Sequence, residues 1–422
     1  MALLGPMVVI AEHSAGDLIE ILGKAGAFPI VEASWRNAPD AIAEIVPAAL
    51  AIADPDHSPE VRHLNGLARA IEAVGGPFMP IIARVTEEGG APLLGALPVD
   101  VDEPVSRLVA RVRSALRVRT LHATAIRRAL AANMPTTFAT AILTDDLLDE
   151  ATVLCVGRGR AYPELSVAIG ERVGVVGSLS IEAAARCLGT RDIDGIVIGD
   201  GFSARMVNAL LIAIAEDAGF RDLPVAVLGG ALDDGMTDRL PNLIRVESDA
   251  RLLVDRLLPF LRLQALEGRL KRMLKTLDSK GLVDPATGLM EPAAFWRDLE
   301  HAAADATERG SALSVARIAF ESQPDRRTSL DAARLLSRLV RDVDVACRDD
   351  DGSVLIAFTE TDLRAAHVVA RRLANTIRQT MITPERDRRT LSPTVTLATL
   401  KPKDNLYSMM ARISAFPKVA AQ

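Results

Sequence analysis

The chain repeats one pattern twice: short, apolar, β-branched runs alternate with longer amphipathic stretches. Such alternation predicts a parallel sheet, because consecutive parallel strands need a long crossover, which is usually a helix. In the first pass the predicted strands cover residues 7–11, 28–32, 49–53 and 79–84. The predicted helices of this pass cover residues 14–23, 61–74 and 105–119.

The second pass follows the same order of elements. Its predicted strands cover residues 152–156, 173–176, 195–198 and 225–228. Its predicted helices cover residues 180–188, 205–218 and 249–263. The two passes therefore look like diverged copies of one module.

The 422 residues suggest about three domains at about 150 residues each. We expect a first module over 1–120, a second over 151–263 and a third domain over 282–422, joined by helical linkers over 121–150 and 264–281. Residues 261–277 carry apolar side chains in steps of three and four, which put one stripe on a helix. That stripe either packs on a neighbouring helix of the same chain or pairs with a second chain in a short coiled coil.

Composition excludes several classes of function. The formal net charge of −6 attracts no phosphate backbone, and only 3% of residues are aromatic, so we expect no nucleic-acid partner. Cys155, Cys187 and Cys347 form no CxxC motif, and the six histidines show no metal-ligand spacing, so no metal or cofactor is expected. The amino-terminal residues lack the features of a signal peptide and no apolar run reaches about 18 residues, so we expect a cytoplasmic protein without membrane insertion.

The last third of the chain follows a different pattern. Predicted strands cover residues 311–320, 343–347, 354–358 and 392–400, and predicted helices cover 330–341 and 363–380. An Asp-Gly pair within residues 348–353 is typical of a hairpin between the two middle strands. This order predicts an α+β domain with a largely antiparallel sheet and helices on one side of it.

Three motifs in this third domain carry a family resemblance. Residues 283–289, Val-Asp-Pro-Ala-Thr-Gly-Leu, resemble the DxLTGL entry motif of GGDEF domains, the fold of diguanylate cyclases. Arg341 and Asp344 resemble that family's RxxD inhibitory site, and the family's five-residue spacer follows them. The signature loop then falls on a sequence that does not read GGDEF: Asp350, Asp351, Gly352, Ser353 and Val354.

The resemblance implies that the cyclase active site is lost. Joining two GTP molecules needs a divalent metal on paired carboxylates. The resemblance places the two metal ligands at Ala319 and Gly352, neither of which is acidic, and Glu321 at the second acidic place of the first strand. Asp350 and Asp351 either belong to an acidic hairpin turn or hold a cation in a shifted register.

The RxxD resemblance implies a different ligand, cyclic di-GMP. A guanidinium at Arg341 can bind phosphate or a guanine edge through two hydrogen bonds, and a carboxylate at Asp344 can accept from guanine N–H groups. The same pattern also occurs at residues 191–194 and 348–351, so a solvated Arg and Asp at the end of a helix is the alternative.

The two α/β modules resemble receiver domains of response regulators, so the chain resembles a response-regulator type of GGDEF protein with two receiver-like domains. The fold class that this implies is α/β plus α+β: two flavodoxin-like receiver domains, then a degenerate GGDEF domain of ferredoxin-like, cyclase-like fold. In the first module Glu12 stands in the acidic pair, Asp54 or Asp56 at the phosphoacceptor place and Thr86 near the hydroxyl place. Glu103 replaces the lysine that neutralises a phosphorylated aspartate.

The second module departs further from the receiver pattern. Asp200 lies one residue beyond the phosphoacceptor place, which Gly199 fills, and Gly229 lies near the hydroxyl place. Asp54 and Asp200 are therefore vestigial phosphoacceptors at most, with plain loop acids as the alternative. The resemblance therefore implies that these modules act through their surfaces, because folds of this kind dimerise and bind protein partners there.

Together these features predict a non-catalytic signalling effector or adaptor. It would bind cyclic di-GMP through Arg341 and Asp344, form a homodimer and present its receiver-like surfaces to protein partners. One alternative is a scaffold that binds no nucleotide because all its sites are lost. The other is a residual GTP-using enzyme that recruits Glu321, Asp350 and Asp351 to a metal.

Overall fold

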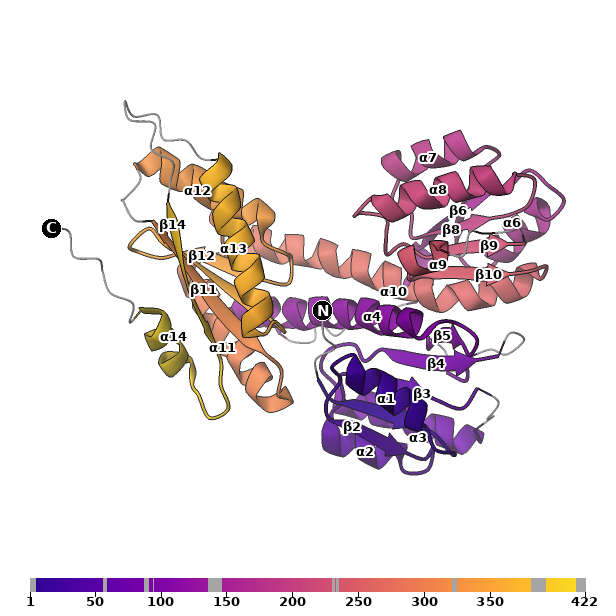
Figure 1. Cartoon of the computed structure of the whole chain (residues 1–422), viewed down its shortest axis with the longest axis horizontal. Coiled ribbons are helices and arrows are strands. Elements are labelled where there is room, and N and C mark those ends of the chain that lie inside the picture. The colour runs from indigo at the N-terminus through magenta and orange to yellow at the C-terminus, as the bar shows by residue number, and fades with distance from the viewer. Residues whose placement is uncertain are drawn as a thin grey trace.

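The computed structural model consists of two sheet-containing lobes at one end of a pair of long helices and a third lobe at the other end (Figure 1). It describes residues 5–55, 59–86, 91–93, 95–135, 146–229, 232, 235–320, 325–380 and 392–414.

The first lobe contains a parallel sheet of five strands in the order β2-β1-β3-β4-β5. Its elements are β1 Met7–Ile10, α1 Gly16–Lys24, β2 Ile30–Ala33, α2 Ala38–Ile45, β3 Ala49–Ile52, α3 Val61–Val74, β4 Ile81–Val85 and β5 Leu97–Asp100. The inner strands β1 and β3 are apolar and buried along their whole length, as expected for a parallel sheet with helices on both faces.

The second lobe repeats this topology with the order β7-β6-β8-β9-β10. Its elements are β6 Thr152–Val156, α6 Tyr162–Gly170, β7 Gly174–Ser178, α7 Ile181–Thr190, β8 Gly195–Ile198, α8 Ala204–Glu216, β9 Val225–Leu228, α9 Met236–Arg239 and β10 Leu243–Val246. Counted from its own first strand, each sheet has the order 2-1-3-4-5 of a flavodoxin-like sheet. The predicted repetition is confirmed at the level of strand order.

The edge strands β5 and β10 and the helices α2 and α6 were not predicted. β5 is four residues long and contains Pro98. Proline has no backbone N–H to donate to a neighbouring strand, so within sheets it is confined to places such as an edge strand, which is where β5 lies. β10 is equally short and includes the exposed Arg245. Short strands without alternation carry little periodic signal, so the sequence pattern does not predict either edge strand.

Two long helices, α4 Val105–Ala131 and α10 Ala250–Leu277, leave the first two lobes and run side by side to the third (Figure 1). Both continue without a break through positions 120 and 263, so the helical parts of the predicted linkers extend the last helix of each module. The predicted apolar stripe on α10 is buried within the chain at Leu261, Leu263, Leu266, Leu270, Leu274 and Leu277. Of the two alternatives for this stripe, packing inside one chain is the one observed.

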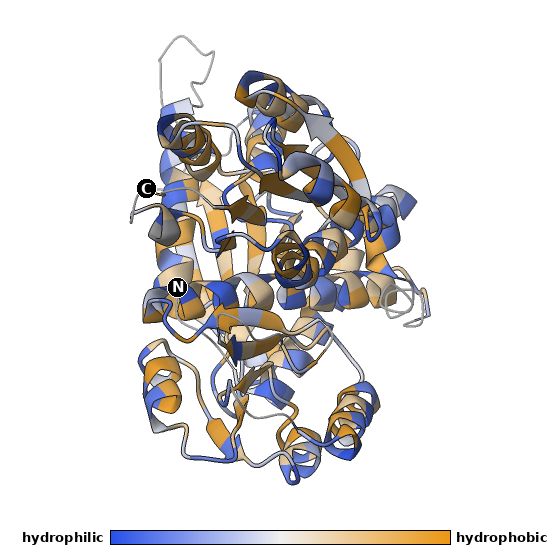
Figure 2. Ribbon diagram, turned by 90° about the vertical axis from the view of Figure 1, so that its right-hand side faces the viewer, coloured by the Kyte–Doolittle hydropathy of each residue, from blue (hydrophilic) through white to orange (hydrophobic). Residues whose placement is uncertain are grey.

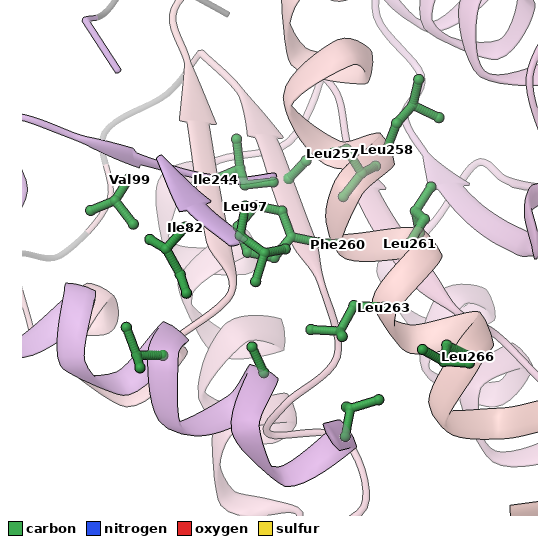
Figure 3. Packing of buried hydrophobic residues seen from close by; sticks show 14 of the residues in the cluster. Ile82, Leu97, Val99, Ile244, Leu257, Leu258, Phe260, Leu261, Leu263 and Leu266 are labelled. Atoms are coloured by element: carbon green, nitrogen blue, oxygen red, sulfur yellow. The ribbon is translucent and has the colours of Figure 1, made fainter. Parts of the chain in front are cut away.

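The first two lobes share a continuous hydrophobic core. Phe260 of α10 is buried among apolar side chains from both edge strands, including Leu97 and Ile244 (Figure 3). The Arg111 guanidinium lies over the Phe260 ring, 5.1 Å from its centroid. The two modules therefore pack edge to edge as one body.

Arginines cross between the modules in both directions. Arg111 of α4 donates to the Pro98 carbonyl of β5 at 2.6 Å and to the Leu243 carbonyl of β10 at 3.2 Å. Arg256, at the matching place in α10, donates to the Thr86 carbonyl of the first module at 2.7 Å. Equivalent side chains thus make reciprocal contacts, as in an interface between two similar subunits.

The sheet of the third lobe is antiparallel, as predicted, and its strand order is β12-β13-β11-β14. Its elements, which follow the short helices η2 Leu147–Glu150 and η3 Asp278–Leu282, are α11 Pro292–Arg309, β11 Leu313–Phe320, α12 Arg326–Leu339, β12 Val345–Arg348, β13 Val354–Thr359, α13 Leu363–Thr380, β14 Pro393–Thr399 and α14 Leu406–Ser414.

The prediction of helices on one side of this sheet was wrong. One apolar cluster joins one face of the strands to α11 and α14, and another joins the opposite face to α12 and α13. The difference comes from α11 and α14, neither of which was predicted; Phe295 and Leu299 of α11 are fully buried. The antiparallel sheet therefore has helices on both faces.

Hydrophobic residues gather on the sheet strands, whereas the helices alternate between hydrophobic and hydrophilic residues along their length (Figure 2). Among the helices of the described residues, none combines the length and the apolarity that crossing a bilayer requires.

Truncating the shared core should destabilise both modules together. We expect Phe260→Ala to lower the free energy of unfolding by about 3–5 kcal/mol, because the change leaves a cavity among fully buried side chains. Urea unfolding followed by circular dichroism should show one transition for the two modules, shifted to lower urea. Tyr407→Ala, at a side chain that is 84% exposed, is the matched control and should shift stability by less than about 0.5 kcal/mol. Two separate transitions, with only one of them shifted, would contradict the shared core.

Candidate functional site

The predicted signature loop forms the tip of the hairpin between β12 and β13. The Asp349 N–H donates to the Ser353 carbonyl at 2.8 Å, and the Gly352 N–H donates to the Asp349 carbonyl at 2.9 Å. Gly352 has a φ of +84°, a left-handed conformation that glycine adopts without strain. The predicted Asp-Gly hairpin is confirmed.

An ion pair within the protein occupies this hairpin. The Arg317 guanidinium of β11 binds the Asp351 carboxylate, and its Nε donates to Ser353 Oγ at 3.0 Å. Asp351 Oδ1 also accepts from the Ser353 hydroxyl at 2.6 Å and from the Ser353 N–H at 2.9 Å. Burial acts to raise the pKa of Asp351, but the Ser353 hydrogen bonds and the charge of Arg317 outweigh it, and the pKa lies below its usual range. The carboxylate stays ionised with a guanidinium as its cation.

No carboxylate stands at the two places where the resemblance puts the metal ligands. Ala319 shares a face of β11 with Arg317, because alternate strand residues point the same way, and it pairs with Thr394 of β14. Gly352 is the turn residue of the hairpin. In the part of the chain that the structure describes, no three His, Cys, Asp or Glu residues are grouped so as to hold a metal. Glu321, the third acid of the alternative metal site, lies outside the described residues.

Sequence reasoning missed Arg317. It stands two residues before Ala319 on a strand that is otherwise apolar from Leu313 to Phe320 except for Ser314. A charged residue on a buried strand needs a partner of opposite charge. An arginine on an otherwise apolar strand is therefore the signal from which an ion pair at this place could have been predicted.

The DxLTGL-like motif folds into a tight turn beside the hairpin. Asp284 accepts from the Thr287 hydroxyl at 2.6 Å and from the Ala286 N–H at 2.9 Å. The pKa of the Asp284 carboxyl lies below its usual value. The largest cause is the hydrogen bond from the Thr287 side chain, and the Ala286 N–H adds to it. Met290, just after the motif, forms a parallel bridge with Cys347 of β12. The motif therefore holds the start of the third domain against the strand that leads into the hairpin.

Arg341 and Asp344 do not share an exposed surface. Arg341 is exposed, whereas Asp344 is only 5% exposed. The Asp344 Oδ1 accepts from the Thr359 N–H at 3.3 Å, and the Asp344 N–H donates to the Arg341 carbonyl at 3.0 Å in a tight turn. Only the arginine of the predicted cyclic di-GMP couple is presented to solvent in this arrangement.

Asp344 instead faces a cluster of charges where α4 meets the third lobe. Burial raises its pKa to about 7, although Arg341, the Thr359 N–H, Arg127 and Arg128 favour the ionised form. The carboxylate is therefore partly protonated near neutral pH.

The same joint buries further charges. Arg128 of α4 binds Asp278 at 3.1 Å and donates to the Asp342 carbonyl at 3.0 Å. Asp298 of α11 is fully buried, and its Oδ1 lies 3.8 Å from Arg127 Nε. We name Arg127, Arg128, Asp278, Asp298 and Asp344 the joint cluster. Sequence reasoning missed it, because both arginines lie in a stretch interpreted as a linker.

In the first module, Glu12 and Asp54 lie together at the carboxyl ends of β1 and β3. The Glu12 N–H donates to Asp54 Oδ2 at 2.5 Å, and Glu12 Oε1 accepts from the Trp35 N–H at 3.1 Å. Each of the two acids therefore binds a backbone N–H group of a neighbouring loop. Asp56, the other phosphoacceptor candidate, lies outside the described residues.

In the second module, Asp200 organises the loop that leads into α6. Its carboxylate accepts from the Arg160 N–H at 2.9 Å and from the Ala161 N–H at 3.1 Å. A Cβ at Gly159 would meet this carboxylate at 2.2 Å, so the loop closes tightly over it.

Glu103 and Thr86, at two other receiver-like positions, face the boundary between the modules. Glu103 binds Arg107 at 3.0 Å and Arg111 at 2.8 Å. The Thr86 carbonyl accepts from Arg256. Both positions thus take part in holding the modules together.

Comparisons with known proteins return partial likenesses. No family model matches the chain and no curated protein matches it. Among solved structures, the coiled coil and GGDEF domain of DgcB from Caulobacter crescentus in complex with c-di-GMP is 17% identical at a TM-score of 0.29, covering 35% of this chain and 84% of that one. The FimX GGDEF domain from Pseudomonas aeruginosa is 18% identical at a TM-score of 0.28, covering 32% and 89%.

A third structure, the diguanylate cyclase SiaD in complex with its activator SiaC from Pseudomonas aeruginosa, is 19% identical at a TM-score of 0.28, covering 35% of this chain and 62% of that one. Each likeness covers about a third of the chain. At these TM-scores the likenesses carry no argument, and the proposals below depend on the residues of this chain.

The burial of Asp344 should make stability fall as pH rises. Because its pKa is about 7 in the folded protein and 3.8 is its ordinary value, the folded state holds the extra proton between these values, and stability is lost as pH rises through about 7. We expect Asp344→Asn, which keeps the acceptor for the Thr359 N–H, to reduce the loss of unfolding free energy between pH 5 and pH 8 by about 2 kcal/mol.

Urea unfolding at the two pH values measures this difference. Asp350→Asn, at an exposed acid of the hairpin tip outside the joint cluster, is the control and should leave the pH dependence unchanged. Equal pH dependence in Asp344→Asn and the unmodified chain would show that Asp344 is ionised in the folded protein throughout this range.

Proposed function

We propose that this protein is a non-catalytic signalling adaptor in which a degenerate GGDEF-like domain is carried by two receiver-like modules. The observation that supports this most directly is the Arg317–Asp351 ion pair at the hairpin. The Arg317 guanidinium beside Asp351 repels a divalent cation and occupies a carboxylate that could bind one.

The chemistry of diguanylate cyclisation supports the same proposal. The reaction needs carboxylates that hold a metal against the triphosphate. Ala319 and Gly352 supply none, and Asp351 is engaged by Arg317 and Ser353. Among the described residues, the two ligand places of the proposed site therefore carry no carboxylate, and Asp351 already has a cation as its partner.

The adaptor has two versions, which differ in whether it binds a nucleotide. The burial of Asp344 supports the version that acts as a scaffold without cyclic di-GMP, because its carboxylate cannot reach a guanine while it accepts from the Thr359 N–H. The exposure of Arg341 supports the second candidate, an effector that binds cyclic di-GMP through Arg341 and a rearranged Asp344.

The receiver-like modules would serve as partner surfaces. Asp54 and Asp200 both accept from backbone N–H groups, and Glu103 stands where a lysine would neutralise a phosphoryl group. These contacts support modules that do not act as phosphorylation switches. A protein partner or a second copy of the chain would bind their exposed faces, because the apolar stripe of α10 is buried.

The purified chain should not convert GTP. We expect no cyclic di-GMP or pyrophosphate release with Mg²⁺ or Mn²⁺, as measured by anion-exchange chromatography, because neither Ala319 nor Gly352 offers the metal a carboxylate. Arg317→Leu, which removes the cation beside Asp351, should remain inactive since Ala319 and Gly352 are unchanged. Turnover by the unmodified chain that Asp351→Asn abolishes would overturn the proposal and favour the residual enzyme.

Calorimetry with cyclic di-GMP separates the two versions. If the protein is a scaffold without a nucleotide site, we expect no saturable binding at about 100 µM cyclic di-GMP. A complex with a binding free energy of about −5.5 kcal/mol would be half formed at that concentration. Saturable binding that Arg341→Ala abolishes would establish the effector instead. Arg338→Ala, on the preceding turn of α12, is the matched control for loss of a neighbouring positive charge.

A further inference from the structure

The helices α12 and α13 give the third lobe a strongly basic surface. Each helix carries four arginines, and the only carboxylate of the two is that of Asp331. Asp331 binds Arg334, which also donates to the Ala286 carbonyl at 2.8 Å. Positive charge is therefore concentrated on these helices, in a chain whose formal net charge is −6. We name their exposed surface the basic face.

The arginines of α13 point to solvent. Arg364, Arg371 and Arg378 recur every seven residues, so they form one stripe along the helix. All three are exposed, whereas the opposite side of α13 packs on the sheet. Among the described residues, none of these three side chains has an ion pair or a hydrogen-bond partner. The stripe is therefore a row of charges that the chain itself does not pair.

The acids next to the two helices do not cancel this charge. Asp325 and Asp362 precede α12 and α13, and each accepts from a backbone N–H at the start of its helix. Residues 321–324 and 381–391, which lie outside the described residues, hold three acids and three arginines, so their formal charges balance. The arginines of α12 and α13 therefore outnumber the acids within and beside these helices.

The outer end of the first lobe carries the opposite charge. It consists of α1, the edge strand β2 and α2, and β2 is the strand farthest from the boundary between the modules. Residues 11–47 contain two cations, Lys24 and Arg36, and Lys24 is already bound to Glu20. The six carboxylates of this segment, which we name the acidic flank, are all exposed: Glu12, Asp17, Glu20, Glu32, Asp40 and Glu44.

Half of the acidic flank is unpaired as well. In the part of the chain that the structure describes, the carboxylates of Asp17, Asp40 and Glu44 have neither an ion pair nor a hydrogen bond. Asp40 and Glu44 stand four residues apart on α2, so they share its exposed side. The acidic flank and the basic face are therefore surfaces of opposite charge on the same chain.

We propose that the basic face of one chain binds the acidic flank of a second copy, so that the copies associate head to tail. Within one chain the two surfaces belong to lobes at opposite ends of the long helices (Figure 1). The helices α12 and α13 cover one face of their sheet, and α11, which packs on α4, covers the other. A contact between two different surfaces leaves one of each free, so it continues into a chain of copies or closes a ring.

Exposed apolar side chains accompany the charges on both surfaces. Phe28, 83% exposed, lies between α1 and β2, and Val368, 66% exposed, lies three residues before Arg371 on α13. Complementary charge mainly directs and orients the encounter, whereas apolar side chains that lose water add affinity. The inference gives the receiver-like surface of the proposed adaptor a partner, but it does not depend on whether the hairpin is inactive or whether cyclic di-GMP binds.

Sedimentation of the full chain at two salt concentrations tests the association. We expect species larger than the monomer at about 20 mM salt and the monomer at about 500 mM, because the Debye length shortens from about 20 Å to about 4 Å. The larger species should grow with protein concentration, as a head-to-tail contact requires. A chain that stays monomeric at low salt would overturn the proposal.

Two charge-reversal variants identify the surfaces. Arg364→Glu with Arg371→Glu changes the basic face, and Asp40→Lys with Glu44→Lys changes the acidic flank. Each variant should weaken self-association about tenfold or more, because like charges then meet across the contact. Each variant also keeps the surface that the other has lost, so an equimolar mixture should form a one-to-one complex at low salt. Circular dichroism checks that both variants are folded.

Arg186→Glu with Arg205→Glu, at exposed arginines of α7 and α8 in the second module, is the matched control. It changes the net charge by the same amount as the basic-face variant and should associate as the unmodified chain does. Equal weakening by this control, or two folded variants that do not bind each other, would show that these surfaces do not meet. Binding of a monomeric chain to phosphatidylserine vesicles at low salt would assign the basic face to a lipid surface instead and would refute self-association.

Discussion

The buried Arg111 guanidinium is the contact on which the arrangement of the modules depends. It donates to the Pro98 carbonyl of one edge strand, to the Leu243 carbonyl of the other and to Glu103, while its flat face rests on Phe260. Each open parallel sheet ends in a strand whose polar groups need partners. Placing the two edges against one arginine satisfies carbonyls of both and lets the apolar side chains around Phe260 join into one core.

The long helices carry that arrangement to the third lobe. Arg111 and Arg128 belong to the same helix, α4, and lie about 25 Å apart along it at 1.5 Å per residue. At the far end Arg127 and Arg128 enter the joint cluster with Asp278 and Asp298. Removing these charges from water costs free energy, so their pairing adds little net stability. A docking position that left one of them buried without its partner would be strongly unfavourable, so the pairs specify a single position. A continuous helix with polar contacts at both ends acts as a fixed spacer between the lobes.

The sequence predicted most of the regular structure and little of the placement of charges. Alternation of apolar and amphipathic runs identified the buried strands, since a strand such as β1 is apolar along its whole length. β5, with Pro98, and β10 escaped because short edge strands lack a periodic pattern. The burial of Asp344 could not be predicted either, because it arises from packing against α4, which is distant in sequence.

Among the described residues, three of the places where the family resemblances put a free acidic group or a lysine make contacts within the chain. Asp351 is bound by Arg317, Asp54 by a backbone N–H, and Glu103 by two arginines of the boundary between the modules. The described contacts of Asp351, Asp54 and Glu103 are all made to other groups of the chain itself. These contacts fit the proposed adaptor, whose partners would recognise the shape of the chain.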